Sequence, residues 1–222
     1  MTSYSEFQKI SDGRLYDIDD FVKVDTKGCV GCGICCHDIG DLVVLTPYDV
    51  YAMKQKCEMR FEDLLTDHIA LREQDKMLLP YLKMQGEDKH CSFLDEQGRC
   101  QIHTHRPNIC RLFPLGRFYE KDGFKYFLQV NNCVMPHLGE MKVRDWLNIK
   151  QYDDNKEMIL KWHQFVKALG FRLKFVYDAK ELENMRQYVL ETFYSIEAEN
   201  DDAFYACFNE RLPMAKKYLG VL

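Results

Sequence analysis

A dense group of thiols lies near the start of the chain. Cys29, Cys32, Cys35 and Cys36 fall within eight positions, and three glycines are interleaved with them. Glycine lets the backbone wrap tightly around a centre and direct amide N–H groups at sulfur. Cysteines at this density predict a metal or iron–sulfur site.

A second cysteine region lies downstream and is expected to complete the site. Eight of the cysteines fall in the two regions together: Cys29, Cys32, Cys35, Cys36, Cys91, Cys100, Cys110 and Cys133. The other two, Cys57 and Cys207, stand alone in segments of helical character. A lone cysteine in a helix is most often a small buried hydrophobic residue, so neither is expected to bind metal.

The spacing of the first region favours iron. The run C-x2-C-x2-C over Cys29, Cys32 and Cys35 matches the first three ligands of bacterial [4Fe–4S] ferredoxins. In that motif the next cysteine comes three residues later and precedes proline, whereas Cys36 follows at once and precedes His37. Neighbouring side chains diverge, so Cys35 and Cys36 are not expected to serve the same metal ion.

Zinc is the competing interpretation. Four thiolates, or three and a histidine, satisfy a tetrahedral structural zinc ion. Such sites usually combine two short C-x2-C knuckles, and this chain has one knuckle followed by widely spaced cysteines. A disulfide scaffold is the third alternative. It is disfavoured because the first residues are polar and mixed in charge, unlike a signal peptide.

Composition describes an ordinary globular protein of one large domain or two small ones. The chain has 222 residues, 46% of them hydrophobic and 29% charged, and a formal net charge of −5. The acidic balance argues against nucleic acid as a partner. No apolar run approaches a membrane span of about 18 residues, so no membrane association is expected. Without an export signal, we expect a cytoplasmic protein.

Basic residues near the cysteines are candidate neighbours of the site. His37, His90, His103 and His105 could each be a ligand or only a polar loop residue, and Cys100-x2-His103 makes His103 the best candidate. Arg106 and Arg111 bracket Cys110 and are predicted to bind the cofactor. Their N–H groups would stabilise cluster sulfur, although salt bridges to the acidic surface are an equal alternative.

The elements that must position these residues can be outlined from local patterns. Thr46 and Pro47 begin a predicted helix over 47–57, and a second, short helix is expected from Phe61. Residues 69–85 could be extended or a hairpin. Further hairpins are predicted around Asp95–Gly98, which would bring Cys91 and Cys100 side by side, and over 116–130.

The last third of the chain has helical periodicity. One helix is predicted to end at Gly170, and two more follow, the last interrupted by Pro213. The predicted fold class is α+β, with an irregular cysteine-rich core of short hairpins and helices followed by a helical region. We expect a lead-in over 1–24, a metal-binding domain over 25–137 and a helical region over 138–222 packed on it.

The two cysteine regions together carry a family resemblance. C-x2-C-x2-C-C, then C-x-F-L, a glycine, C-x-I-H and R-P-x-x-C-R-x-F-P resemble the CxxCxxCC family of zinc- or iron-chelating proteins, the YkgJ-type cysteine-cluster proteins. The resemblance covers Cys29 to about Cys133. It implies metal chelation by the seven cysteines up to Cys110, with Cys133 as an eighth. Arg106, Pro107, Arg111 and Pro114 match the last element.

The sequence therefore predicts a metal-binding protein with an iron–sulfur cluster of the [4Fe–4S] type. The cluster would serve electron transfer or modification of a substrate, as in an Fe–S oxidoreductase, and the redox partner or substrate is not identified. The alternative is a structural zinc module that mediates interactions without catalysis. A third interpretation is a metalloenzyme with an open coordination position.

Overall fold

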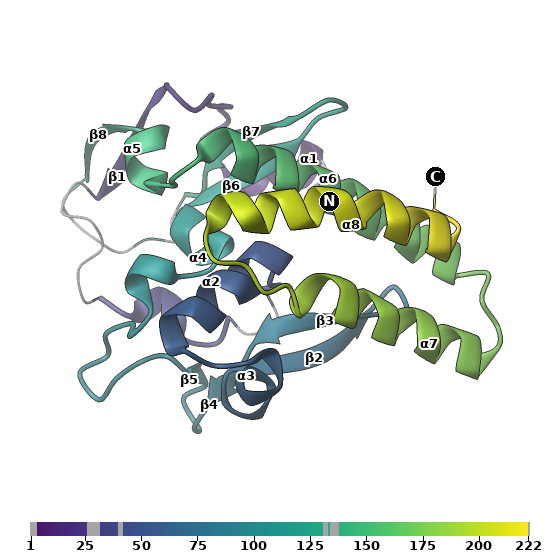
Figure 1. Ribbon diagram of the computed structural model, residues 1–222. Helices are drawn as coiled ribbons and strands as arrows, with labels where there is room; N and C mark the ends of the chain where they lie inside the picture. Colours follow the sequence, from purple (N-terminus) through teal and green to yellow (C-terminus); the bar gives the residue numbers. More distant parts are fainter. Residues whose placement is uncertain (1–3, 26–31, 40–41, 131–132, 134–137, 222) are drawn as a thin grey trace.

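The computed structural model describes residues 4–25, 32–39, 42–130, 133 and 138–221 (Figure 1). Four two-stranded antiparallel sheets and several short helices build the part that carries the cysteines, and longer helices follow. The predicted α+β class is confirmed. None of the helices in these ranges combines the length and apolar composition that crossing a bilayer requires.

The first sheet joins two segments that are distant in sequence. After helix α1 (Tyr4–Ile10), strand β1 (Phe21–Asp25) pairs with β8 (Leu138–Lys142), with Val22 opposite Met141. The two strands lie side by side at one end of the molecule (Figure 1). The chain therefore enters and leaves the cysteine regions at neighbouring positions. The division into segments 1–24, 25–137 and 138–222 stays a prediction.

Two predicted helices begin where the local signals place them. Helix α2 (Pro47–Cys57) starts with a capping box, in which the Thr46 side chain accepts from the Asp49 N–H and the Asp49 carboxylate accepts from the Thr46 N–H. Helix α3 (Phe61–Asp67) follows, with a similar role for Asp63. Both predictions are confirmed.

Residues 69–85 contain a hairpin, one of the two expected conformations. Strand β2 (Ile69–Gln74) pairs with β3 (Met77–Leu82), and β6 (Leu115–Tyr119) pairs with β7 (Phe124–Leu128) as predicted. The hairpin predicted between Cys91 and Cys100 is wrong in its pairing. Cys91 lies in β5 (His90–Cys91), opposite Met84 of β4 (Met84–Gln85), and Cys100 is opposite Leu94. The Asp95–Gly98 turn closes with the Gly98 N–H donating to the Asp95 carbonyl, and the Gln101 N–H donates to the Phe93 carbonyl, a register that places Cys100 beside Leu94 and not beside Cys91.

Short helical turns carry the remaining cysteine segments. The 3-10 turn η1 (Ile34–Cys36) contains two of the cysteines, and the 3-10 turn η2 (His103–His105) precedes helix α4 (Asn108–Leu112). Pro107 stands at the N-cap of α4, where its missing N–H costs no helical hydrogen bond.

The C-terminal helices are longer than predicted. After α5 (Val143–Leu147), α6 (Tyr152–Leu173) runs through Gly170, which does not end the helix. A Cβ at Gly170 would lie 3.2 Å from Asp75 Cβ and 3.4 Å from Met77 Cε, so the glycine permits close packing against the β2–β3 hairpin. Helix α7 (Ala179–Val189) continues into the π-helical turn η3 (Leu190–Tyr194).

Helix α8 (Asp201–Leu219) also corrects a prediction, because it is not interrupted at Pro213. Buried Leu212, Ala215 and Leu219 hold the segment on either side of the proline against the core. Helices α6, α7 and α8 lie together on one side of the molecule (Figure 1).

Aromatic contacts join α8 to α2. The ring of Tyr48 stacks on Tyr205 at 5.3 Å, and Tyr51 stacks on Phe204 at 4.7 Å between ring centroids. The buried Lys54 donates to the Ile196 carbonyl and to the Glu197 carboxylate. A single hydrophobic core extends from β1 to α8, so the helical region supports the element on which the site rests.

A buried carboxylate connects α2 to α4. Asp49 is 2% exposed. Its Oδ1 accepts from the Asn108 backbone N–H at 2.7 Å and from Asn108 Nδ2 at 2.9 Å, and its Oδ2 accepts from the N–H and hydroxyl of Thr46 at 2.8 Å each. Asn108 opens α4, two residues before Cys110. The capping carboxylate of one helix therefore fixes the start of another.

Replacing Asp49 with alanine should lower the free energy of unfolding by about 3 kcal/mol, because buried donors of Asn108 lose a charged acceptor. The matched control is Asp63→Ala. Asp63 caps α3 in the same way but is solvent-exposed, so its loss should lower the free energy of unfolding much less. Urea denaturation of both variants measures the difference, and equal losses would show that the Asn108 contact contributes nothing.

Candidate metal centre

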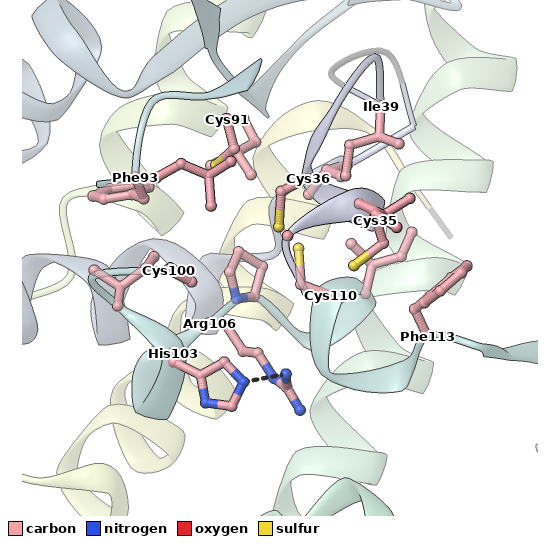
Figure 2. A pocket seen from close by; sticks show the side chains of 18 of the residues that line it. Cys35, Cys36, Ile39, Cys91, Phe93, Cys100, His103, Arg106, Cys110 and Phe113 are labelled. Carbon is pink, nitrogen blue, oxygen red and sulfur yellow. Dashed lines mark hydrogen bonds between the residues drawn. The ribbon is translucent and has the colours of Figure 1, made fainter. Parts of the chain in front are cut away.

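Five cysteines line one cavity of about 410 Å³: Cys35, Cys36, Cys91, Cys100 and Cys110. Figure 2 shows the side chains of Cys35, Cys36 and Cys110 turned toward the same space. Four separate elements supply the five residues. These are η1, strand β5, the segment after the Asp95–Gly98 turn, and α4. The fold thus gathers thiols from positions up to 75 residues apart, from 35 to 110.

The rest of the cavity wall is largely apolar. Phe93, Ile102 and Leu115 are buried, with exposed fractions of 2%, 3% and 1%, and Pro107 and Phe113 complete this part of the wall. Such a wall disfavours the thiolate form of an unliganded cysteine. It also keeps water away from whatever the sulfur atoms bind.

Burial dominates the acid–base behaviour of these thiols. It raises the pKa of Cys91 to about 11, against a hydrogen bond from the Phe93 backbone, and the Cys100 and Cys35 thiols raise it further. The pKa of Cys100 and that of Cys110 are also raised, in both cases mainly by burial. Metal binding would therefore have to displace thiol protons and to repay the desolvation of the thiolates.

Backbone contacts hold the first cysteine loop against the second region. His37 and His90 form an isolated antiparallel bridge, and the Asp38 N–H donates to the Lys89 carbonyl at 2.9 Å. Gly33 has φ +65°, and a Cβ built there would lie 2.7 Å from the Gly98 carbonyl oxygen. The glycine between Cys32 and Ile34 therefore permits a close approach of backbone to backbone.

Asp88 joins the two histidines of this contact, a role that the sequence analysis missed. Its carboxylate lies 2.7 Å from His90 Nδ1 and 3.6 Å from His37 Nε2. His90 is the main cause of the lowered pKa of Asp88. His37 and His90 thus stand beside Cys36 and Cys91 as polar neighbours bridged by a carboxylate. The spacing Asp88-x-His90 is the feature of the sequence that could have indicated this contact.

His103 and Arg106 form another part of the cavity wall. Arg106 Nη1 donates to His103 Nε2 at 2.7 Å, as the dashed line in Figure 2 shows. Burial, followed by the charges of Arg106 and Arg111, lowers the pKa of His103, so its Nε2 is suited to accept this bond. Arg106 Nε is buried and has no hydrogen-bond partner among the described residues.

Other predicted site residues lie elsewhere or outside the described part. Cys29 is not among the described residues. Cys32 and Cys133 are half-buried and are absent from the described lining of the cavity. Arg111 borders a neighbouring cleft instead, where it donates to backbone carbonyls. Cys57 and Cys207 pack against the hydrophobic core, in agreement with the structural role expected of them.

The thiols surround the cavity without converging on a point. Within the described ranges, no group of three or more Cys, His, Asp or Glu side chains is placed to hold a single metal ion. All nine described cysteines are free thiols, so no disulfide joins any of them. The donor set nevertheless fits a thiophilic metal, since five sulfur donors border one mostly apolar space.

Comparison with known families agrees with this donor set. Residues 28–133 match the family model CxxCxxCC, described as a putative zinc- or iron-chelating domain. The match covers a little under half of the chain, so this part of the sequence is similar to the family. The resemblance seen in the sequence is confirmed, and the family supports metal binding without distinguishing zinc from iron. Comparison with curated proteins and with solved structures found no match.

A substitution at Gly33 should separate the first cysteine loop from the second cysteine region. Gly33→Ala places a methyl group against the Gly98 carbonyl, so we expect metal content per chain to fall at least twofold with a less stable fold. Gly13→Ala is the control, because Gly13 has φ +79° and no atom within 4 Å of an added Cβ. Metal content of the purified variants measures the effect. Equal loss in both would assign it to backbone strain alone.

Proposed function

We propose that the cavity thiols hold an iron–sulfur cluster of the [4Fe–4S] type. The observation that carries the proposal is the arrangement of the thiols around a space of about 410 Å³. Ligand sulfurs of one tetrahedral zinc ion lie about 3.8 Å from one another at a Zn–S distance of about 2.3 Å. Each cysteine of a cluster binds a different iron atom, so cluster ligands stand farther apart.

Four of the five thiols form the preferred ligand set: Cys35, Cys91, Cys100 and Cys110. Mutual charge supports this choice. Cys91, Cys35 and Cys100 each raise the pKa of Cys110, and Cys100 and Cys35 raise that of Cys91. Four neighbouring thiolates repel one another strongly unless positive iron lies between them. Cys36 would then be a fifth thiol, and Cys29, Cys32 and Cys133 would be candidates for further ligands.

Arg106 is the proposed N–H donor to the bound group. Its buried Nε has no partner among the described residues, and Arg106 is one of the residues that line the cavity. An N–H donor near sulfur stabilises the reduced cluster and raises its potential. Arg111, which was predicted to share this role, borders the neighbouring cleft and is not part of the proposal.

A cluster in this position would exchange single electrons, which suits electron transfer or modification of a substrate. The protein's own contribution is an apolar wall that limits water and a cationic group that offsets thiolate charge. A cytoplasmic location is part of the proposal because a reducing compartment keeps thiols free to bind metal.

Structural zinc is the second candidate. The family description names zinc beside iron, and a zinc ion could draw the thiols together on binding. This alternative predicts a colourless protein that unfolds when zinc is removed.

Metal and sulfide analysis of anaerobically purified protein distinguishes the two. We expect iron and acid-labile sulfide in equal amounts, about four of each per chain, with visible absorption that bleaches on reduction. Stoichiometric zinc without sulfide would contradict the cluster and establish the alternative.

Cys110→Ser should lower metal content and thermal stability together, because the cavity loses one of the four proposed ligands. Cys207→Ser is the matched control: Cys207 is also half-buried but lies in α8, away from the cavity, and should change neither. The metal content of Cys32→Ser shows whether Cys32, a predicted ligand that does not border the cavity, also binds metal. Normal loading of Cys110→Ser would contradict the ligand assignment.

A further inference from the structure

A second cleft shares a wall with the thiol cavity. It has a volume of about 740 Å³ and lies between α2, η2, α5 and the start of α8. His103 and Arg106 border both spaces, and the hydrogen bond between them is part of the shared wall. A molecule bound in the cleft would therefore lie next to the proposed metal group.

Arg111 gives this cleft a fixed positive charge. Its Nη2 donates to the Thr104 carbonyl at 2.7 Å, and its Nη1 lies 3.4 Å from the carbonyls of Leu147 and Asn148. These bonds use at most three of its five N–H groups. Carbonyls orient the guanidinium without neutralising it, so donors remain for an anion.

Arg106 and Lys150 add to the charge. Within the described part of the chain, no carboxylate forms an ion pair with Arg106, Arg111 or Lys150. Burial is the main cause of the lowered pKa of Arg111, and the charge of Arg106 is the next. The second effect is expected where two guanidinium groups are close together. Two unpaired guanidinium groups at one end of a cleft form an anion site.

The acidic residues of the cleft do not neutralise the positive charge at this end. Asp49 acts on the pKa of Arg111 less than burial and the charge of Arg106 do, and its oxygens accept four hydrogen bonds from Thr46 and Asn108. Asp201 is hydrogen-bonded to the Tyr48 hydroxyl, and Asp145 is an exposed residue in the first turn of α5.

The size and walls of the cleft indicate an organic ligand. A volume of 740 Å³ is within the range of small-molecule sites and much larger than one inorganic oxyanion. Tyr48, Tyr51 and Trp146 supply aromatic surface around the charged end. Together these features favour a carboxylate or phosphate group attached to an apolar or aromatic body.

We propose that this cleft binds a small organic anion, with its carboxylate or phosphate on Arg111 and Lys150, beside the His103–Arg106 wall. As the substrate site of the metal centre, this inference rests on the proposed function. Binding of the anion itself does not depend on which metal the cavity holds.

Isothermal titration of the anaerobically purified, metal-analysed protein tests the proposal with benzoate, phenyl phosphate and inorganic phosphate as probes. We expect saturable binding of benzoate or phenyl phosphate, tighter than that of inorganic phosphate. Benzoate and phenyl phosphate distinguish a carboxylate site from a phosphate site. If the purified protein contains zinc in place of iron and sulfide, the proposed cluster is refuted. The titration still tests whether the cleft binds an anion.

Variants locate the site. Arg111→Gln should weaken the preferred probe at least about tenfold and Lys150→Gln about threefold, with unchanged metal content. Lys121→Gln, in the turn between β6 and β7, is the matched control and should bind normally. If Arg111→Gln fails to fold, Lys150→Gln decides alone. The proposal is overturned if neither organic probe binds, if inorganic phosphate binds as tightly, or if binding survives in the folded variants.

Discussion

The energetic cost of holding several thiols in an apolar cavity constrains the rest of this structure. Burial raises the pKa of Cys91, Cys100 and Cys110, so each thiolate formed there must be repaid by a bound cation. Without that cation the protonated thiols gain little from being near one another. The elements around the cavity must therefore hold it open by contacts of their own.

Those contacts come from three directions. The first cysteine loop is held against the second region by the His37–His90 bridge and by the close approach of Gly33 to Gly98. Hydrogen bonds from Asn108 to Asp49 fix the start of α4. Aromatic stacking of α2 on α8 secures α2 in turn. The C-terminal helices thus stabilise the cavity at a distance, although they contribute no cysteine to it.

Local signals in the sequence were sufficient for elements that depend on local chemistry. The capping residues of α2 and the turn residues of the β6–β7 hairpin determine those elements within a few positions. The predicted helix end at Gly170 and the predicted interruption at Pro213 are wrong, because tertiary packing outweighs local preference at both positions. Cys91 pairs with the two-residue strand β4, which the local sequence does not predict.

The site was predictable in composition but not in arrangement. Spacing and family resemblance identified the cysteines, and five of them border one cavity. Spacing gave no indication that Arg111 lies in a separate cleft or that Asp88 bridges two histidines, because these positions depend on how distant segments fold together.

Differential alkylation followed by mass spectrometry tests the central claim most directly, by comparing metal-loaded and chelator-treated protein. The structure predicts that Cys35, Cys91, Cys100 and Cys110 are protected when metal is bound and react after its removal, whereas Cys57 and Cys207 react equally in both states. Equal reactivity of the cavity thiols with and without metal would contradict the claim that they hold it.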